Sequence, residues 1–312
     1  MNYLTPKEMA KIWGVSDQQV RIYCREGRVP GVVCKNKTWM IPEGTKKPDK
    51  KDPSQYVHKK PRPLAKKLIK QKKKKNYHGF YDYVQINLTY SSCRMASNRL
   101  KMEQVESIFK KGKVKVGFEP MKVSDVIEVM NHCLCVDYML EHFEDSLTPK
   151  YIKKLHFLLM NGTVDERRER VRPGEFRSAK SNRRDNLGVK ADKIDSKLRL
   201  LMAEYEFEEE HSLEDILDFH VKFEEIFPFK DGNGRIGRLI MFKECLRNNV
   251  TPFILDDKRR GRYLDGIRAW PRKKDILTEV IEEAQQRFAA QMVLQDLREH
   301  GSKFWPVGYT ED

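Results

Sequence analysis

Residues 226–238, with the sequence IFPFKDGNGRIGR, have the residue types of a loop that binds phosphate. A Gly-Asn-Gly turn directly precedes an apolar segment that is predicted to be helical, so several backbone N–H groups would point toward one place. Arg235 and Arg238 are three residues apart and lie on the same side of the first helical turn. Guanidinium groups match the geometry of phosphate. The stretch therefore predicts a site for nucleotide phosphate; the alternative is a capped helix start with solvated arginines.

The same loop carries one acid and one aromatic residue whose positions bear on chemistry. Asp231 could hold Mg²⁺, a hard cation that takes carboxylate and phosphate oxygens. Phe227 stands where a base would be useful, and its side chain cannot accept a proton. His220 is seven residues earlier, about 10 Å along a helix, so we expect a core or supporting residue there. The loop alone leaves open an enzyme, a former enzyme and a binding protein.

The elements that must position this loop are mostly helices. From Tyr77 onward the apolar pattern predicts a mainly α domain with few strand signals. Residues 174–189 could form a short hairpin. Helices are predicted at 79–96, 102–111, 123–143, 148–161, 192–210, 212–227, 232–247, 260–268 and 274–298.

Composition limits the class of protein. The chain has 312 residues, 39% hydrophobic and 34% charged, enough for one large domain and a small one. No apolar run reaches about 18 residues, so no membrane span is expected, and the N-terminus lacks the pattern of a signal peptide. The six cysteines have no metal-ligand spacing, which favours reduced thiols and a cytoplasmic location.

The charge is concentrated at one end of the chain. Residues 1–76 contain 21 Lys and Arg against 6 Asp and Glu, whereas residues 77–312 contain 40 of each. The lysine- and proline-rich stretch 47–76 is interpreted as a basic linker, with one short helical piece at 63–71. This asymmetry predicts that the N-terminal quarter binds a polyanion, and that the main domain is neutral.

The first 46 residues have the outline of a small winged helix-turn-helix domain. Thr5 and Glu8 form a capping-box pattern at the start of a first helix, and Gly14 allows a tight turn. Ser16 is placed to cap a second helix that Gly27 ends, and two short apolar strands follow. The residues predicted to face inward are Leu4, Met9, Ile12 and Trp13 in the first helix, and Val20 and Tyr23 in the second.

The segments KEMAKIWGVSDQQVRIYCREGRVPG and TWMIP resemble the DNA-binding domain of the MerR/excisionase family. The resemblance covers about residues 2–46 and implies that the second helix enters the major groove, with the wing beside phosphates. The residues then predicted to contact DNA are Gln18, Gln19, Arg21, Arg25, Lys35 and Lys37. The alternative is a module for protein contacts or dimerisation.

The segment FEEIFPFKDGNGRIGRLIMFKECL resembles the core motif of Fic (Fido) domain proteins, HxFx(D/E)GNGRxxR. RPGEFRS, at 172–178, resembles the start of the family's flap hairpin. The resemblance covers about 80–290 and implies an all-helical Fic domain, at 77–312, with a short β-hairpin flap. The nucleotide-binding residues it implies are Gly232, Asn233, Gly234, Arg235, Arg238 and Tyr263.

The activity that this resemblance implies is AMPylation, the transfer of AMP from Mg-ATP to a hydroxyl group of a target protein. In the family the motif His deprotonates that hydroxyl, and the acid at the position of Asp231 holds Mg²⁺. Phe227 occupies the position of the His, and a missing general base typically costs about 10²- to 10⁴-fold in rate. The resemblance therefore implies an ATP- and Mg²⁺-binding protein whose transfer activity is impaired or lost.

A second departure from the family concerns its inhibitory helix, which has the motif (S/T)xxxE(G/N). The matching stretch, YSSCRMASNRLKMEQV, begins within the helix predicted near 80–96. Aligned on Ser92, the inhibitory Glu falls on Ala96 and the following Gly or Asn falls on Ser97. Base and inhibitor are thus both replaced, as in a natural pseudoenzyme or in a chain with engineered substitutions.

Three functions remain open at this stage. The first is a Fic pseudoenzyme that binds ATP or another nucleotide and is tied to DNA through residues 1–76, an arrangement known in bacteria. The second is a residually active adenylyltransferase that modifies a protein target. The third is a DNA-binding regulator that uses the Fic fold only as a sensor or as a homodimerisation body.

Overall fold

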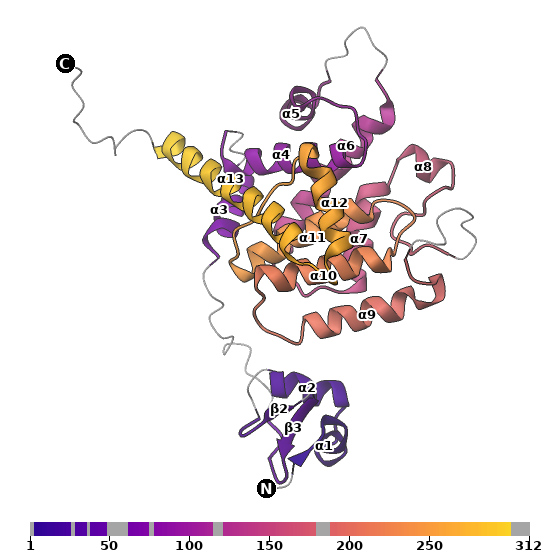
Figure 1. Ribbon diagram of the computed structural model, residues 1–312, viewed down its shortest axis with the longest axis vertical. Coiled ribbons are helices and arrows are strands. Elements are labelled where there is room, and N and C mark those ends of the chain that lie inside the picture. Colours follow the sequence, from indigo (N-terminus) through magenta and orange to yellow (C-terminus); the bar gives the residue numbers. More distant parts are fainter. Residues whose placement is uncertain are drawn as a thin grey trace, which may run out of the picture. The chain divides into compact units, whose positions relative to one another are not determined.

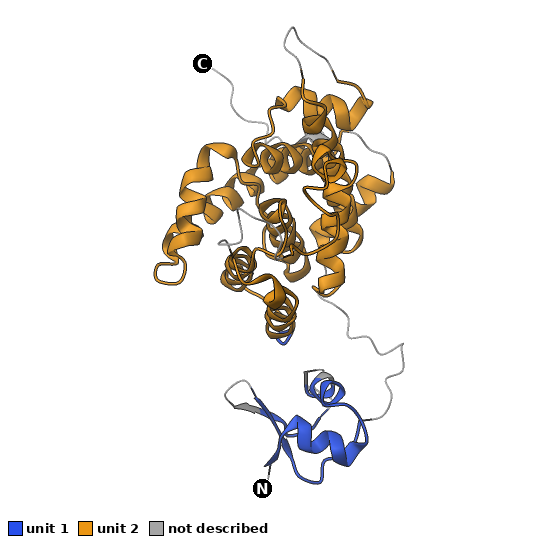
Figure 2. Cartoon of the chain, turned by 90° about the vertical axis from the view of Figure 1, so that its right-hand side faces the viewer, with its two compact units in different colours: residues 1–60, 207–209 blue, residues 61–206, 210–312 orange. Residues whose placement is uncertain are grey.

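The computed structural model divides the chain into two compact units (Figures 1 and 2): residues 1–60 with 207–209, and residues 61–206 with 210–312. The architecture is mainly helical, as predicted, with one small sheet. The residues that the structure describes are 3–25, 29–35, 38–48, 62–74, 78–114, 121–178 and 188–300.

The N-terminal unit contains two helices and a three-stranded antiparallel sheet. Helices α1 (Pro6–Trp13) and α2 (Asp17–Arg25) are separated by Gly14, whose φ of 63° is left-handed. The strands lie in the order β1-β3-β2, and Val33 pairs with Met40. Their bounds are Tyr3–Leu4 for β1, Val33–Lys35 for β2 and Thr38–Pro42 for β3.

Local signals predict the first helix and its cap, but Leu4, which was expected on the inward face of that helix, lies in β1 instead. The capping box of α1 forms, with Glu8 N donating to Thr5 Oγ1 at 3.4 Å and Thr5 N donating to Glu8 Oε2 at 2.8 Å. The prediction that Ile12 is buried is wrong, since its side chain is 64% exposed. The buried stripe runs through Pro6, Met9, Ala10 and Trp13, and the i, i+3, i+4, i+7 spacing leaves Ile12 beside it.

The main unit is built from helices that agree with the predicted ranges to within a few residues. The predicted helix 192–210 is shorter, because it is a helix only to Tyr205. The α-helices are α3 (Pro63–Lys73), α4 (Phe80–Met95), α5 (Met102–Lys111), α6 (Val123–Glu141), α7 (Pro149–Met160), α8 (Val164–Arg167), α9 (Ile194–Tyr205), α10 (Leu213–Ile226), α11 (Asn233–Asn248), α12 (Arg260–Ala269) and α13 (Asp275–His300). Short 3₁₀ turns, η2 (Ala191–Lys193) and η3 (Asp257–Arg259), precede α9 and α12.

The short helical piece predicted at 63–71 is present as α3, but it belongs to the main unit and not to a linker. Ala65 and Leu68, three residues apart on that helix, are 1% and 0% exposed and belong to the main hydrophobic core. Their i, i+3 spacing places both on one face of a helix whose other residues are largely lysines. A basic stretch with two well-spaced apolar anchors has thus packed as a helix of the main unit.

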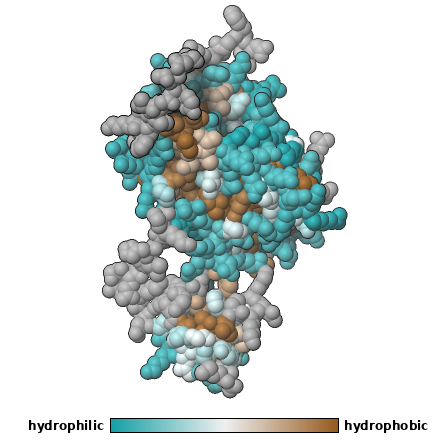
Figure 3. Space-filling view, turned by 60° about the vertical axis from the view of Figure 1, so that its left-hand side comes forward, coloured by the Kyte–Doolittle hydropathy of each residue, from teal (hydrophilic) through white to brown (hydrophobic). Residues whose placement is uncertain are grey.

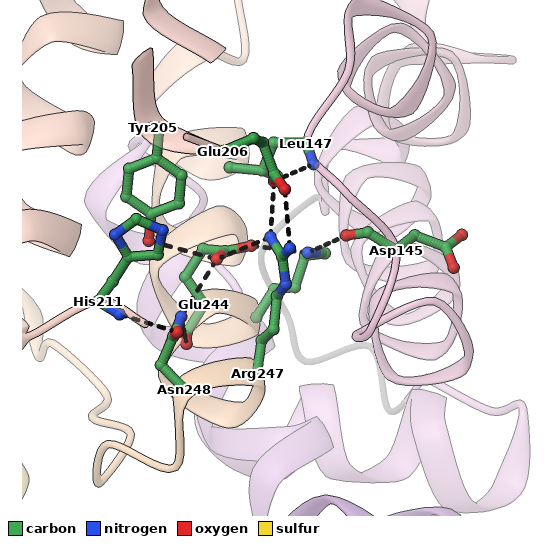
Figure 4. Close-up of polar contacts among 9 residues, drawn as sticks. Asp145, Leu147, Tyr205, Glu206, His211, Glu244, Arg247 and Asn248 are labelled. Atoms are coloured by element: carbon green, nitrogen blue, oxygen red, sulfur yellow. Dashed lines mark hydrogen bonds and ion pairs between the residues drawn. The ribbon is translucent and has the colours of Figure 1, made fainter. Parts of the chain in front are cut away.

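Helix α11, which begins at the predicted phosphate loop, lies in the middle of this unit (Figure 1). It packs against α4, α6, α7 and α10. At its far end Arg247 forms a bidentate ion pair with Glu206, at 2.6 and 2.7 Å (Figure 4). Buried Lys243 donates to Glu244 and to the carbonyl oxygen of Asp145, both at 2.6 Å. These contacts fix the helix that carries the candidate site.

The flap hairpin predicted at 174–189 lies partly outside the described residues. Its described ends form no strand; they bond to the chain beside Phe227 instead. Arg177 N donates to Pro228 O at 2.9 Å, and Val189 N donates to Ile226 O at 3.3 Å. Both described ends of this segment therefore lie next to the candidate site.

Among the described residues, no helix is both long enough and apolar enough to cross a bilayer. The face of the molecule in Figure 3 is mostly hydrophilic, with apolar patches of limited extent.

Candidate functional site

The predicted phosphate loop joins the end of α10 to the start of α11. Phe227 ends α10 in a left-handed conformation, with φ 50° and ψ 62°. Gly232, with φ 83°, immediately precedes the first residue of α11, Asn233. The Asn233 amide closes the loop, because it accepts from Phe229 N at 2.9 Å and donates to Phe229 O at 2.8 Å. The loop is therefore held in one shape before any ligand binds.

The two loop glycines lie in confined positions. A Cβ atom on Gly232 would lie 3.1 Å from Leu159 Cδ2, in addition to the cost of its positive φ. A Cβ atom on Gly234 would lie 3.0 Å from Arg238 Nη1. A side chain at 234 would therefore displace the arginine that follows one turn later.

A cavity of about 230 Å³ opens at this loop. It brings together Phe227, Asp231, the turn 232–235 and Arg238, which belong to the motif, and Tyr263, which the resemblance also placed at the nucleotide. It also brings in Ala96, from the far end of α4. The lining residues are Met95, Ala96, Phe227, Asp231, Gly232, Asn233, Gly234, Arg235, Arg238, Arg260, Tyr263 and Leu264.

Arg235 is fixed by two carboxylates. Its guanidinium lies 3.2 Å from Glu128 Oε2 and 3.3 Å from Asp231 Oδ2, and its side chain is 3% exposed. Burial alone would lower the pKa of Arg235, but the charges of Asp231 and Glu128 raise it above its ordinary value. Glu128 was not predicted, since it lies on α6, and no motif or spacing in that helix points to the loop.

Arg238 is fixed by helix α4. Its Nε donates to Ser92 Oγ at 3.1 Å and its Nη2 donates to Ser92 O at 2.9 Å. Ser92 is the residue on which the inhibitory motif was aligned, and Ala96, one turn later, lines the cavity beside Arg238. Ser97 follows with φ 74°, a conformation that Gly or Asn adopts more readily.

Behind the cavity lies a small group of buried polar residues. His220 is 1% exposed, as predicted for a core or supporting residue, and its Nε2 is 2.5 Å from the Tyr263 hydroxyl. Burial, together with the nearby charge of Arg238, lowers the pKa of His220 to about 3. Burial raises the pKa of Glu224 to about 7, although Arg238 acts in the opposite direction. Neither group lines the cavity.

The residues predicted to contact DNA are only partly described. Gln18 and Arg21 are exposed on α2, Gln19 is half-buried, and Arg21 pairs with Asp17 at 3.2 Å. Arg25 belongs to α2 and Lys35 to β2, but their side chains lie outside the described atoms, as does the whole of Lys37.

Arg260 and Leu264 are lining residues that were not predicted. Arg260 lies in the stretch DDKRRGRYLDG, where three arginines and a lysine occur within five residues. Nothing in the local spacing separates Arg260 from its neighbours, so only the tertiary structure identifies it.

Comparison with known proteins identifies a domain within the main unit. Residues 146–245 match the family model described as Fic/DOC family, so the chain contains a Fic/DOC domain. The protein adenylyltransferase Fic of Culex quinquefasciatus is 26% identical over 186 residues. This match covers 56% of the chain but only 35% of that relative, so the chain spans about a third of the curated protein it matches.

Solved structures agree on the fold. A Fic domain-containing signaling protein from Bacteroides thetaiotaomicron superposes with a TM-score of 0.59 at 16% identity, covering 77% of this chain and 99% of that one. Fic-1 from C. elegans gives 0.58 at 16% identity, covering 75% and 71%. A Fic family protein from Desulfovibrio desulfuricans gives 0.53 at 22% identity, covering 79% and 78%. At these identities the likeness establishes the fold alone.

Proposed function

We propose that the cavity binds ATP, with its phosphates at the start of α11, and that AMP transfer from this ATP is impaired by Phe227. The observation that carries the proposal is the cavity itself, which gathers the glycine turn, two arginines and Tyr263 around one space against Phe227. The first N–H groups of α11 have no partner within the helix and are available to an anion. The relative named protein adenylyltransferase Fic supports AMP transfer as the parent activity.

The two motif arginines are held in place before the nucleotide arrives. Glu128 and Asp231 orient Arg235, whereas Ser92 holds Arg238 through Nε and Nη2. This leaves Nη1 of Arg238 on the side of Gly234, 3.0 Å from where a Cβ atom would be. A guanidinium that is already oriented loses less side-chain entropy when it binds phosphate.

Asp231 is the residue suited to hold Mg²⁺ here. It is the one carboxylate among the lining residues, and its side chain is 45% exposed. Mg²⁺ is usually bound by one or two protein carboxylates together with substrate phosphates, so a single acid beside the phosphate loop fits this ion. Bound there, the ion would neutralise phosphate charge and order the polyphosphate chain.

Arg238→Ala is expected to weaken Mg-ATP binding by roughly 10- to 150-fold, since hydrogen bonds from a charged donor contribute about 1.5–3 kcal/mol each. Calorimetry of the wild-type and variant chains at a saturating Mg²⁺ concentration measures the change. Arg268→Ala is the matched control, because Arg268 is an exposed arginine that pairs with Asp265 and does not line the cavity. Equal affinity of Arg238→Ala and wild type would exclude this loop as the phosphate site.

We further propose that the N-terminal unit binds DNA. Supporting observations are the 13 Lys and Arg against 6 Asp and Glu in residues 1–60, an excess of 7 positive charges, and the exposed polar face of α2. In this second function the Fic/DOC domain would act as a nucleotide sensor attached to DNA, and phosphate contacts by lysines would supply affinity that does not depend on sequence.

Deleting residues 1–60 is expected to abolish a mobility shift of genomic DNA fragments that the full chain produces. The deletion ends before α3, because Ala65 and Leu68 belong to the core of the main unit. The shift by the full chain should weaken steeply as salt is raised from 50 to 200 mM, as expected when counterions are released from DNA. Binding that survives the deletion would place the DNA site elsewhere.

A further inference from the structure

The cavity contains a third arginine, Arg260, whose side chain is exposed to solvent. It is the first residue of α12, and its Nε donates to the carbonyl oxygen of Met95 at 3.2 Å. Within the described part of the chain, its two terminal nitrogens make no hydrogen bond or ion pair. Arg235 and Arg238, by contrast, already have protein partners through their terminal nitrogens.

The acids near Arg260 are engaged by other arginines. Asp257 pairs with Arg94 at 3.3 Å, and Asp256 pairs with Arg259 at 2.5 Å. The lining residues include three arginines against one acid, Asp231, which gives the cavity a net charge of +2. A cavity with this excess and with free guanidinium donors is suited to a ligand that carries several negative charges.

Arg238 and Arg260 both donate hydrogen bonds to carbonyl oxygens of α4, at points about one helical turn apart. Arg238 bonds to Ser92 O and Arg260 bonds to Met95 O, and three residues of α4 correspond to about 4.5 Å along its axis. The next residue, Ala96, has only a methyl group in the cavity, so it neither fills this end nor neutralises the two charges. The end of α4 therefore holds the guanidinium groups of Arg238 and Arg260 one after the other along one side of the cavity.

We propose that Arg260 binds a phosphate of the nucleotide beyond the one held by the start of α11, and so makes the site selective for nucleoside di- and triphosphates over monophosphates. The proposal rests on the nucleotide binding proposed above. Arg238 and Arg260 would contact successive phosphates of one chain. The α11 N–H groups and Arg238 would hold the inner phosphate and Arg260 the next one, while Asp231 would hold the Mg²⁺ that neutralises their charge.

The alternative role for Arg260 is a structural one, in which its bond to Met95 O simply fastens α12 to α4. A matched variant separates the two roles, since the Arg94–Asp257 pair joins α4 to the adjoining η3 segment without an arginine in the cavity. Arg262→Ala is a second control, because it removes one positive charge, as Arg260→Ala does. Arg262, two residues from Arg260, pairs with Glu279 and Glu283 on α13 and lies outside the cavity.

Calorimetry with ATP, ADP and AMP on the full chain tests the proposal, using wild type, Arg260→Ala, Arg94→Ala and Arg262→Ala. Arg260→Ala is expected to weaken ATP and ADP about 10-fold or more and to leave AMP within about 2-fold, so that the preference for ATP over AMP falls. The two control variants should keep the wild-type preference.

Two results would overturn the inference while leaving the nucleotide site intact. One is unchanged affinity of Arg260→Ala for all three nucleotides; the other is an equal loss for all three that Arg94→Ala reproduces. A wild-type chain that binds none of the three would instead overturn the proposed nucleotide function, and this inference with it.

Discussion

Replacing Phe227 by histidine is expected to raise the transfer of label from α-labelled ATP to protein by about 10²- to 10⁴-fold over the wild-type chain. The reason is that the remaining parts of the proposed site are in place, whereas a group that can remove a proton from the attacking hydroxyl is missing. An imidazole at this position would face the same cavity as the glycine turn and the two motif arginines.

The backbone at position 227 favours this substitution. Phe227 has φ 50° and ψ 62°, in the left-handed region, where histidine is found more often than most residues with a Cβ atom. Its carbonyl oxygen accepts from Arg177 Nε at 2.7 Å, and its N–H donates to Phe223 O at 3.1 Å. Both bonds use only the backbone atoms of residue 227, so they remain when its side chain changes.

Two further variants show whether a gain in labelling comes from the base. Phe227→Asn tolerates the same backbone conformation but has no basic group, so it should remain at the wild-type level. Adding Ala96→Glu to Phe227→His should lower the labelling again, because an acid at 96 would enter the cavity beside Arg238. Labelling that stays at background in Phe227→His, with ATP binding intact, would mean that the site lacks more than its base.

The parts of this site that sequence could predict are those that lie together in the chain. Phe227 through Arg238 form one loop and one helical turn, so residue type and spacing describe their chemistry directly. Ser92, Glu128 and Arg260 come from three other segments and were missed or left without a role. Their positions depend on how α4, α6 and α12 pack around α11, and the spacing of apolar residues in the sequence does not predict this packing.

The fold was predicted well where local rules act alone and less well where packing decides. Amphipathic spacing and caps such as Thr5 and Ser16 located the helices, and both caps form as side-chain hydrogen bonds. The composition of α3 suggested a linker, yet Ala65 and Leu68 belong to the core, and Leu64 and Ile69 pack against it. Ile12 shows the converse, since an apolar residue beside a buried stripe remains exposed.

A second prediction concerns the free energy of unfolding, which we expect to fall below neutral pH. Three histidines, His132, His156 and His220, are 0 to 1% exposed. Burial lowers their pKa values to about 3, about 4 and about 3, and for His132 and His220 neighbouring arginines lower them further. In the unfolded chain these groups titrate near pH 6.5. Their contribution is therefore fully present above pH 6.5 and is lost as the pH falls toward the folded values, because the unfolded chain takes up protons first.

Each of these histidines should give a slope of about 1.4 kcal/mol per pH unit between roughly pH 6 and pH 4.5. Glu224 and Asp82 act in the opposite direction, because burial raises their pKa values to about 7 and about 6. The total slope is therefore smaller than three histidines alone would give. A comparison of one variant with the wild type isolates a single group from this sum.

His132→Asn is the variant that tests this account most directly. The asparagine oxygen can accept from Thr89, whose hydroxyl lies 3.0 Å from His132 Nδ1, so the buried hydrogen bond is kept while the titrating group is removed. Urea unfolding at several pH values between 4.5 and 7 should give a slope smaller than that of the wild type by about 1.4 kcal/mol per pH unit. Equal slopes for wild type and His132→Asn would show that His132 is not kept neutral by burial, and the acid lability of the fold would then have another origin.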